Sequence, residues 1–133
     1  MKKILPASLL LLGVVTAISC DNDQHVNDIV GVGPVKIDSV HLVSNTMDLH
    51  SVQSIRTFST YPSGCDSFYN YRYEKNGMER TVTAVAVKTN GACTMAQHTK
   101  ASQFTFQPME TGTYTFKFYQ ADNTYLTETI VVE

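Results

Sequence analysis

The most restrictive feature of this sequence is a candidate β-hairpin near the middle of the chain. Residues 67–74 are expected to form an extended strand, in which every second side chain points to the same face. Three tyrosines share one of these faces: Tyr69, Tyr71 and Tyr73. Asn76-Gly77 follows, and both residues accept the positive φ of a type I′ turn. The return segment, residues 80–89, is apolar on both faces around Val82–Val87, which predicts a strand in the middle of a sheet.

Extended segments of the same kind recur through the rest of the chain. They are rich in β-branched and aromatic residues, are bounded by Gly, Pro and Asn, and cover residues 34–43, 52–61, 104–106, 113–119 and 126–132. The alternation slips at Asp38-Ser39, which indicates a bulge or a break into two strands. About seven strands and no sustained helical period predict an all-β fold, an antiparallel β-sandwich of immunoglobulin-like size. A closed barrel is the alternative.

Composition and charge exclude several classes of protein. The chain has 133 residues, which is enough for one small domain. Hydrophobic residues make up 43% and charged residues 17%, so the chain can bury a core and is not intrinsically disordered. The formal net charge of −2 provides no basic field, and we expect no nucleic-acid partner.

The first nineteen residues have the organisation of an export signal. Lys2 and Lys3 precede an apolar segment, Ile4–Val15, that is too short to span a bilayer. Small residues follow at Ala17 and Ser19, the positions that a signal peptidase reads. We therefore expect residues 1–19 to be removed as a signal peptide.

Residues Ala17-Ile18-Ser19-Cys20 resemble the lipobox of bacterial lipoproteins. This resemblance implies that Cys20 is lipidated, becomes the mature N-terminus and anchors the protein to a membrane. Plain secretion is the alternative, because the general signal peptidase would cut at the same bond. Residues 20–33 then form the lipidated cysteine and a flexible acidic tether, and residues 34–133 form the sandwich domain. Acidic residues directly after Cys20 resemble the surface-export signal of Bacteroidota lipoproteins, which implies a protein anchored in the outer membrane on its periplasmic or cell-surface face.

Two further cysteines remain as a pair. In an oxidising compartment Cys65 and Cys93 can form a disulfide, and the candidate hairpin between them would return both to the same side. The bridge would close a loop of 29 residues, for which chain entropy predicts about 3.6 kcal/mol of stabilisation. A metal site built from Cys65, Cys93 and His98 is the alternative, although these residues lack the usual ligand spacing.

The chain as a whole resembles small flavobacterial or Bacteroidota lipoproteins with an immunoglobulin-like domain. The resemblance rests on the lipobox, on Pro62-Ser63-Gly64-Cys65, on Cys93 and on Phe104-x-Phe106-x-Pro108-x-x-x-Gly112-x-Tyr114-x-Phe116. Asp38-Ser39-Val40 also matches the short O-glycosylation sequon of Bacteroidota, which makes Ser39 a candidate acceptor. The resemblance brings no catalytic motif with it.

The sequence contains no motif for catalysis or for a cofactor. We therefore expect a lipid-anchored, non-enzymatic binding or interaction module with no cofactor and no metal. An exposed stripe of Tyr69, Tyr71 and Tyr73 could bind a carbohydrate or protein ligand; the alternative is that the stripe packs in the core.

Two other functions are alternatives to a binding module. Phe104–Phe118 loosely resembles the end of chagasin-type cysteine-protease inhibitors. Gly112-x-Tyr114-x-Phe116 suggests a cupredoxin-like metal carrier, although Gln120–Tyr125 offers no Cys, His or Met ligand.

Overall fold

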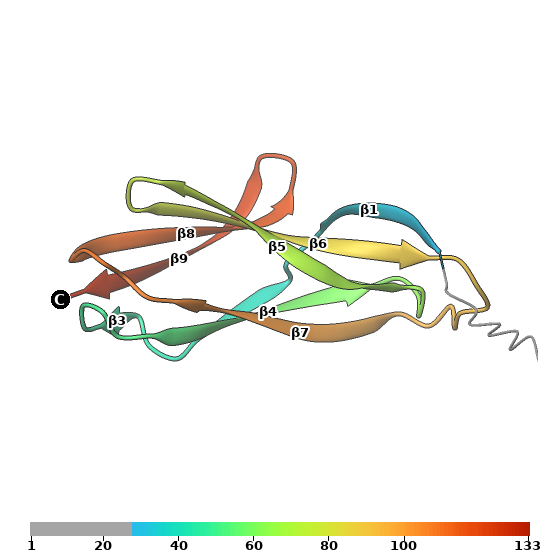
Figure 1. Ribbon diagram of the computed structural model, residues 1–133, viewed down its shortest axis with the longest axis horizontal. Coiled ribbons are helices and arrows are strands. Elements are labelled where there is room, and N and C mark those ends of the chain that lie inside the picture. The colour runs from blue at the N-terminus through green and yellow to red at the C-terminus, as the bar shows by residue number, and fades with distance from the viewer. Residues whose placement is uncertain (1–27) are drawn as a thin grey trace, which may run out of the picture.

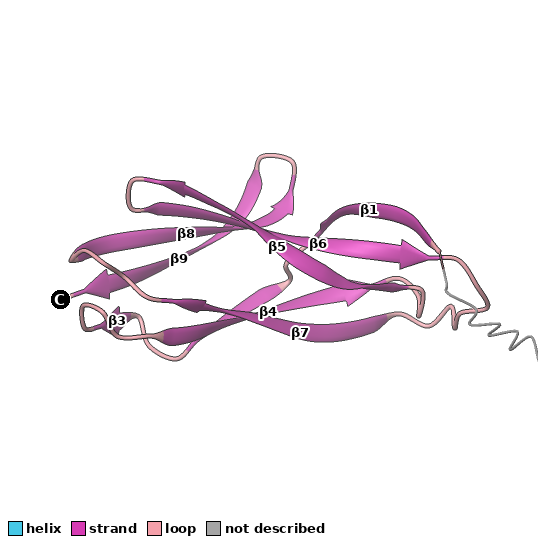
Figure 2. Cartoon of the chain, viewed as in Figure 1, coloured by secondary structure: helices cyan, strands magenta, loops and turns pink. Residues whose placement is uncertain are grey.

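A computed structural model describes residues 28–133 of the chain, and this part forms two packed β-sheets (Figures 1 and 2). In chain order the strands are β1 (Ile29–Val35), β2 (Ser39–Leu42), β3 (Thr46–Met47), β4 (Gln53–Tyr61), β5 (Asp66–Asn76), β6 (Glu79–Thr89), β7 (His98–Phe106), β8 (Gly112–Ala121) and β9 (Thr124–Val132). The predicted all-β sandwich is confirmed, with nine strands in place of about seven. Within residues 28–133 no helix is long or apolar enough to cross a membrane.

The strand order explains why residues 82–87 are apolar on both faces. The larger sheet has the order β1-β6-β8-β9-β3, and β5 pairs with the other edge of β6. One edge of β6 is therefore covered by β5, and the opposite edge is shared by β1 and β8. The smaller sheet has the order β2-β4-β7. The predicted central position of this strand is confirmed.

The predicted slip at Asp38-Ser39 is the point where the chain leaves one sheet and enters the other. β1 belongs to the larger sheet and β2 to the smaller one, and Ile37, the middle one of the three residues between them, is fully buried. Its amide donates to the carbonyl of Tyr119 at 3.0 Å, and its carbonyl accepts from Gln120 at 3.3 Å. These contacts fix the crossing against β8.

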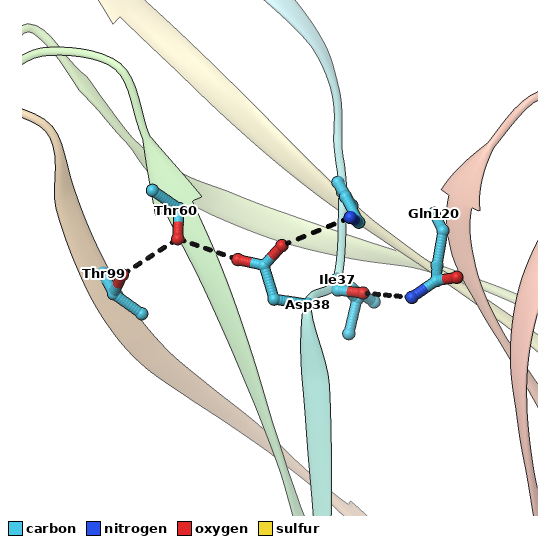
Figure 3. A network of polar contacts seen from close by, with 6 residues as sticks. Ile37, Asp38, Thr60, Thr99 and Gln120 are labelled. Carbon is cyan, nitrogen blue, oxygen red and sulfur yellow. Dashed lines mark hydrogen bonds and ion pairs between the residues drawn. The ribbon is translucent and has the colours of Figure 1, made fainter.

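A polar network holds the other side of this crossing (Figure 3). The Thr60 hydroxyl donates to the Asp38 carboxylate at 2.8 Å and lies 2.9 Å from the Thr99 hydroxyl. Lys36 pairs with the same carboxylate at 3.9 Å. The network therefore joins the crossing to β4 and β7 of the smaller sheet.

The predicted boundary between tether and domain is wrong for residues 29–33. These residues belong to β1, which pairs antiparallel with β6 and carries a bulge between Ile29 and Gly31. Ile29, Val30 and Val32 remain about 60% exposed, at 59, 60 and 61%. Because this edge strand presents glycines towards the protein and apolar side chains to solvent, the usual alternation of a half-buried strand is missing.

Half of the buried core residues are aromatic or branched side chains from β8 and β9. Tyr114, Phe116 and Phe118 alternate along β8 and are at most 3% exposed, as the sequence predicts. Ile130 and Val132 of β9 are buried beside them. Burial of one large apolar side chain contributes about 1.5–3 kcal/mol, so these five residues supply a large part of the stability of the fold.

The predicted hairpin is present, but its turn and its first strand differ in detail. Asn76 pairs with Glu79, which leaves Gly77 and Met78 in the turn, and of residues 76–78 only Gly77 has a positive φ, of 59°. The type I′ prediction is therefore wrong; glycine at the first central position is typical of a type II′ turn.

A β-bulge in β5 also separates the three tyrosines. The register shifts between Phe68 and Asn70, so Tyr69 turns outwards and is 57% exposed. Phe68, Tyr71 and Tyr73 pack against the core instead. The prediction that all three tyrosines share one face is wrong, because the bulge inserts one extra residue into the alternation.

Cys65 and Cys93 form the predicted disulfide, with their Cα atoms 5.4 Å apart. The Thr89 amide donates to the Cys65 carbonyl at 3.0 Å, and the Gly64 amide donates to the Thr94 carbonyl at 2.8 Å. The disulfide therefore closes the open end of the β5–β6 hairpin, on the right in Figure 1, whereas the hairpin turn and the C-terminus lie on the left. β1 begins at the disulfide end.

Candidate functional site: an aromatic cleft between the sheets

A cleft of about 560 Å³ opens where β5 of one sheet faces β7 of the other; we call it the aromatic cleft. Its walls come from the turn end of the β5–β6 hairpin and from the connection between β7 and β8. Small-molecule sites have volumes of about 300–1,000 Å³, so the aromatic cleft has the size of a ligand site.

Five aromatic side chains line the aromatic cleft: Tyr71, Tyr73, Phe104, Phe106 and Tyr114. They make edge-to-face contacts between the two sheets, from β5 to β7 and from β7 to β8. Ring centroids lie 5.1 Å apart for Tyr71 and Phe104, 5.8 Å for Tyr73 and Phe104, and 5.1 Å for Phe106 and Tyr114. Because each ring is held by a neighbour, the apolar walls are formed before any ligand arrives.

Arg80, near the start of β6, is the main cation of the aromatic cleft. Its Nη1 donates to the backbone carbonyls of Gly77 and Glu79, which ties the side chain to the hairpin turn. Its guanidinium carbon lies 5.1 Å from the centroid of the Tyr114 ring. Tyr114 is held in turn, because its hydroxyl donates to the Glu110 carbonyl at 2.9 Å. The guanidinium is therefore fixed in orientation by backbone and ring.

Burial in the cleft wall raises the pKa of Tyr73 above its usual value, and the nearby Arg80 guanidinium opposes part of that rise. Burial also raises the pKa of Tyr71, and hydrogen bonds to Thr57 and Ser102 oppose that rise. Both phenols are therefore protonated at neutral pH. A protonated phenol can donate as well as accept a hydrogen bond, and both properties are useful for orienting a ligand.

The three tyrosines of the predicted stripe do not lie together in the structure. Tyr71 and Tyr73 line the aromatic cleft, whereas Tyr69 lies on the outer face of β5. The other candidate residues are not at the cleft. Ser39 is exposed on β2, which leaves its hydroxyl accessible for modification, and Cys20 lies outside the described residues.

The disulfide also decides between the two expectations for the cysteines. Cys65 and Cys93 are bonded to each other and provide no thiolate, so the metal site with His98 is not formed. The His98 ring stacks on Tyr61, with centroids 5.4 Å apart. Among residues 28–133, no group of three or more His, Cys, Asp or Glu side chains could hold a metal ion.

Sequence reasoning does not identify Arg80, Phe106 and Tyr114 as members of one site. Arg80 lies 34 positions before Tyr114 along the chain, and only the parallel pairing of β6 with β8 brings them together. One signal is present: an arginine shortly before the apolar run Val82–Val87. Nothing local shows which ring it would face.

Comparison with known proteins adds no identification. No protein-family model matches the chain, and neither the curated proteins nor the solved structures contain a significant match.

Proposed function

We propose that this protein is a lipid-anchored, non-enzymatic binding module of the bacterial cell envelope, and that its ligand occupies the aromatic cleft. The observation that carries the proposal is the aromatic cleft itself, with five rings around about 560 Å³ and a fixed guanidinium. Pockets with apolar walls and a few oriented polar groups are typical of ligand sites.

The position of the cleft supports the same proposal. β1 begins at the disulfide end of the domain, and the hairpin turn beside the cleft lies at the opposite end (Figure 1). An anchor at Cys20 would be attached eight residues before Asp28, on the β1 side. The aromatic cleft would then face away from the membrane and towards ligands in solution.

A matched pair of variants tests the proposal. Tyr73→Ala removes a ring from the aromatic cleft, and Tyr69→Ala removes an exposed ring from the outer face of the same strand. Nuclear magnetic resonance titration of the protein with envelope saccharides and peptides should find ligands whose shifts map to the cleft. Binding should weaken with Tyr73→Ala and persist with Tyr69→Ala. Ligands whose binding depends only on Tyr69, or shifts mapped elsewhere, would contradict the proposal.

A further inference from the structure

The net charge of the aromatic cleft is opposite in sign to the net charge of the whole chain. Three ionisable side chains other than tyrosine line the cleft: Lys75, Arg80 and Glu110. In the described part of the chain the ion pairs are Lys36–Asp38 and Lys117–Glu79, so none of the three is paired. The cleft therefore has a net charge of +1 from two cations and one anion, whereas the whole chain has −2.

Arg80 has a donor that the protein itself does not satisfy. Its Nε is buried and has no hydrogen-bond partner among residues 28–133. A buried donor without a partner destabilises the protein, and more so when the group is charged. An acceptor supplied by a ligand would remove this destabilisation.

The free part of the guanidinium has the geometry of a carboxylate site. Nη1 is occupied by the carbonyls of Gly77 and Glu79, and the Tyr73 phenol also interacts with the guanidinium. The edge formed by Nε and Nη2 is the one that a ligand would use. Two parallel donors on one edge of a guanidinium match the two oxygens of a carboxylate. Because Nε is covered, a ligand oxygen reaches it only after neighbouring side chains shift.

The apolar walls of the cleft favour a ligand in which the carboxylate is attached to an apolar group. The guanidinium lies over one face of the Tyr114 ring, and the Phe106 ring packs edge-on against Tyr114. An inorganic anion would satisfy Arg80 but would leave these apolar walls in contact with water. An aromatic or large aliphatic group would remove these walls and its own apolar surface from water, which favours binding.

From this juxtaposition we infer that the aromatic cleft recognises a carboxylate on an aromatic or large apolar group, with the carboxylate on the Nε edge of Arg80 and Lys75 as the second cation. The inference rests on the proposed function, since it names the ligand class of the same cleft. Two sources share this chemistry: a free aromatic acid, and the C-terminal carboxylate of a peptide that ends in an apolar residue.

Paired probes that differ only in charge test the inference. N-acetylphenylalanine and its primary amide have nearly the same shape, and a five-residue peptide ending in Phe can be prepared with a free or an amidated C-terminus. Isothermal titration should show that each acid binds at least tenfold more tightly than its amide, a difference of about 1.4 kcal/mol. Tighter binding of the peptide acid than of N-acetylphenylalanine would indicate a C-terminal peptide as the source; the reverse order would indicate a free acid.

Three variants distinguish recognition of the acid by the cleft from an effect of the protein's net charge on binding. Lys75→Gln removes an exposed cation of the cleft, and Arg80→Lys keeps the charge but loses the two-donor edge. Both should weaken binding of the acid several-fold and leave the amide unchanged. Arg72→Gln is the matched control, because Arg72 lies on β5 between the two cleft tyrosines and is exposed on the opposite face.

The outcomes distinguish this inference from the proposed function. Equal binding of acid and amide in the cleft would overturn the inference and leave the binding module standing. If Arg72→Gln and Lys75→Gln lowered the affinity for the acid equally, the inference would also be overturned, because recognition would then depend on net charge alone. Failure of both acids to bind would refute the ligand class, whereas the comparison of Tyr73→Ala with Tyr69→Ala decides the proposed function separately.

Discussion

The phenolic oxygen of Tyr71 lies 2.7 Å from the hydroxyl of Thr57, and this hydrogen bond joins the two sheets across the core. Tyr71 belongs to β5 of the larger sheet, and Thr57 belongs to β4 of the smaller one. Thr57 is only 1% exposed, so its hydroxyl has little access to water if the tyrosine oxygen is removed. The contact therefore links the wall of the aromatic cleft to the stability of the sandwich.

We predict that Tyr71→Phe lowers the free energy of unfolding by about 0.5–1.5 kcal/mol, because Thr57 would be left without that buried partner. Thr57→Val should cost a similar amount, and the double variant should cost less than the sum of the two. Chemical denaturation of the four proteins forms a double-mutant cycle. Strict additivity would show that the hydrogen bond contributes nothing.

Alkaline pH should destabilise the fold through its partly buried tyrosines. Burial raises the pKa of Tyr71 and Tyr73 above the usual value of 10.0. From pH 10 upwards the unfolded chain loses phenolic protons that the folded chain retains, so the free energy of unfolding falls until the folded groups also ionise. Denaturation at increasing pH, with phenolate absorbance as the second signal, measures this fall. A Tyr71→Phe/Tyr73→Phe protein should show a smaller pH dependence; an unchanged one would contradict the prediction.

Removal of the disulfide should destabilise the domain without changing its fold. We expect Cys65→Ala/Cys93→Ala to lower the free energy of unfolding by about 2–4 kcal/mol, because the unfolded chain gains the freedom of a long open loop. Thermal denaturation measures the loss. Intact mass after alkylation without reductant provides the direct check on the natural protein: two alkylated thiols at these positions in the folded state would refute the bridge.

Gly112 should not tolerate a side chain. Its φ is 142°, a region that residues other than glycine rarely adopt, and an added Cβ would lie 2.6 Å from Sδ of Met78. The methionine end can move but the backbone cannot, so Gly112→Ala should cost about 1–3 kcal/mol. Adding Met78→Ala should recover only the steric part. Gly33→Ala is the control, since nothing lies within 4 Å of its added Cβ and its φ is not positive.

Replacement of Cys20 tests the proposed anchor. Cys20→Ala should release the protein from the membrane fraction and leave its melting temperature unchanged, because the first strand of the domain begins at Ile29. Mass spectrometry of the membrane-bound natural protein should find a lipid on Cys20. A mature protein with a free thiol at this position would refute the proposed lipidation.

The sequence is sufficient for the features of the fold that depend on local pattern. The apolar run Val82–Val87 predicts a central strand, and the phase slip at Asp38 predicts a break, because both are properties of consecutive residues. The bulge at Tyr69 cannot be predicted in the same way. A single inserted residue changes the pairing with β6 but leaves the alternating composition of β5 unchanged.

The candidate site is less accessible to sequence reasoning for a related reason. The alternation points to Tyr71 and Tyr73, but the cleft exists only because Phe104 of the other sheet lies against them. Arg80 and Tyr114 meet through a parallel strand pair, and such pairing leaves no mark between neighbours in the chain. Side chains that meet across sheets are therefore the part that requires the structure.

The pairing of β1 with β6 also determines how the domain would respond to a pulling force. Tension between an anchor at Cys20 and a ligand in the aromatic cleft would enter through Ile29 at one end of the β1–β6 ladder and leave near Arg80 at the other end of β6. The hydrogen bonds between the two strands would then be loaded together in shear rather than broken one after another. Resistance to such a force is governed by the rate of unfolding, so β6 would bear mechanical load as well as form the middle of the sheet.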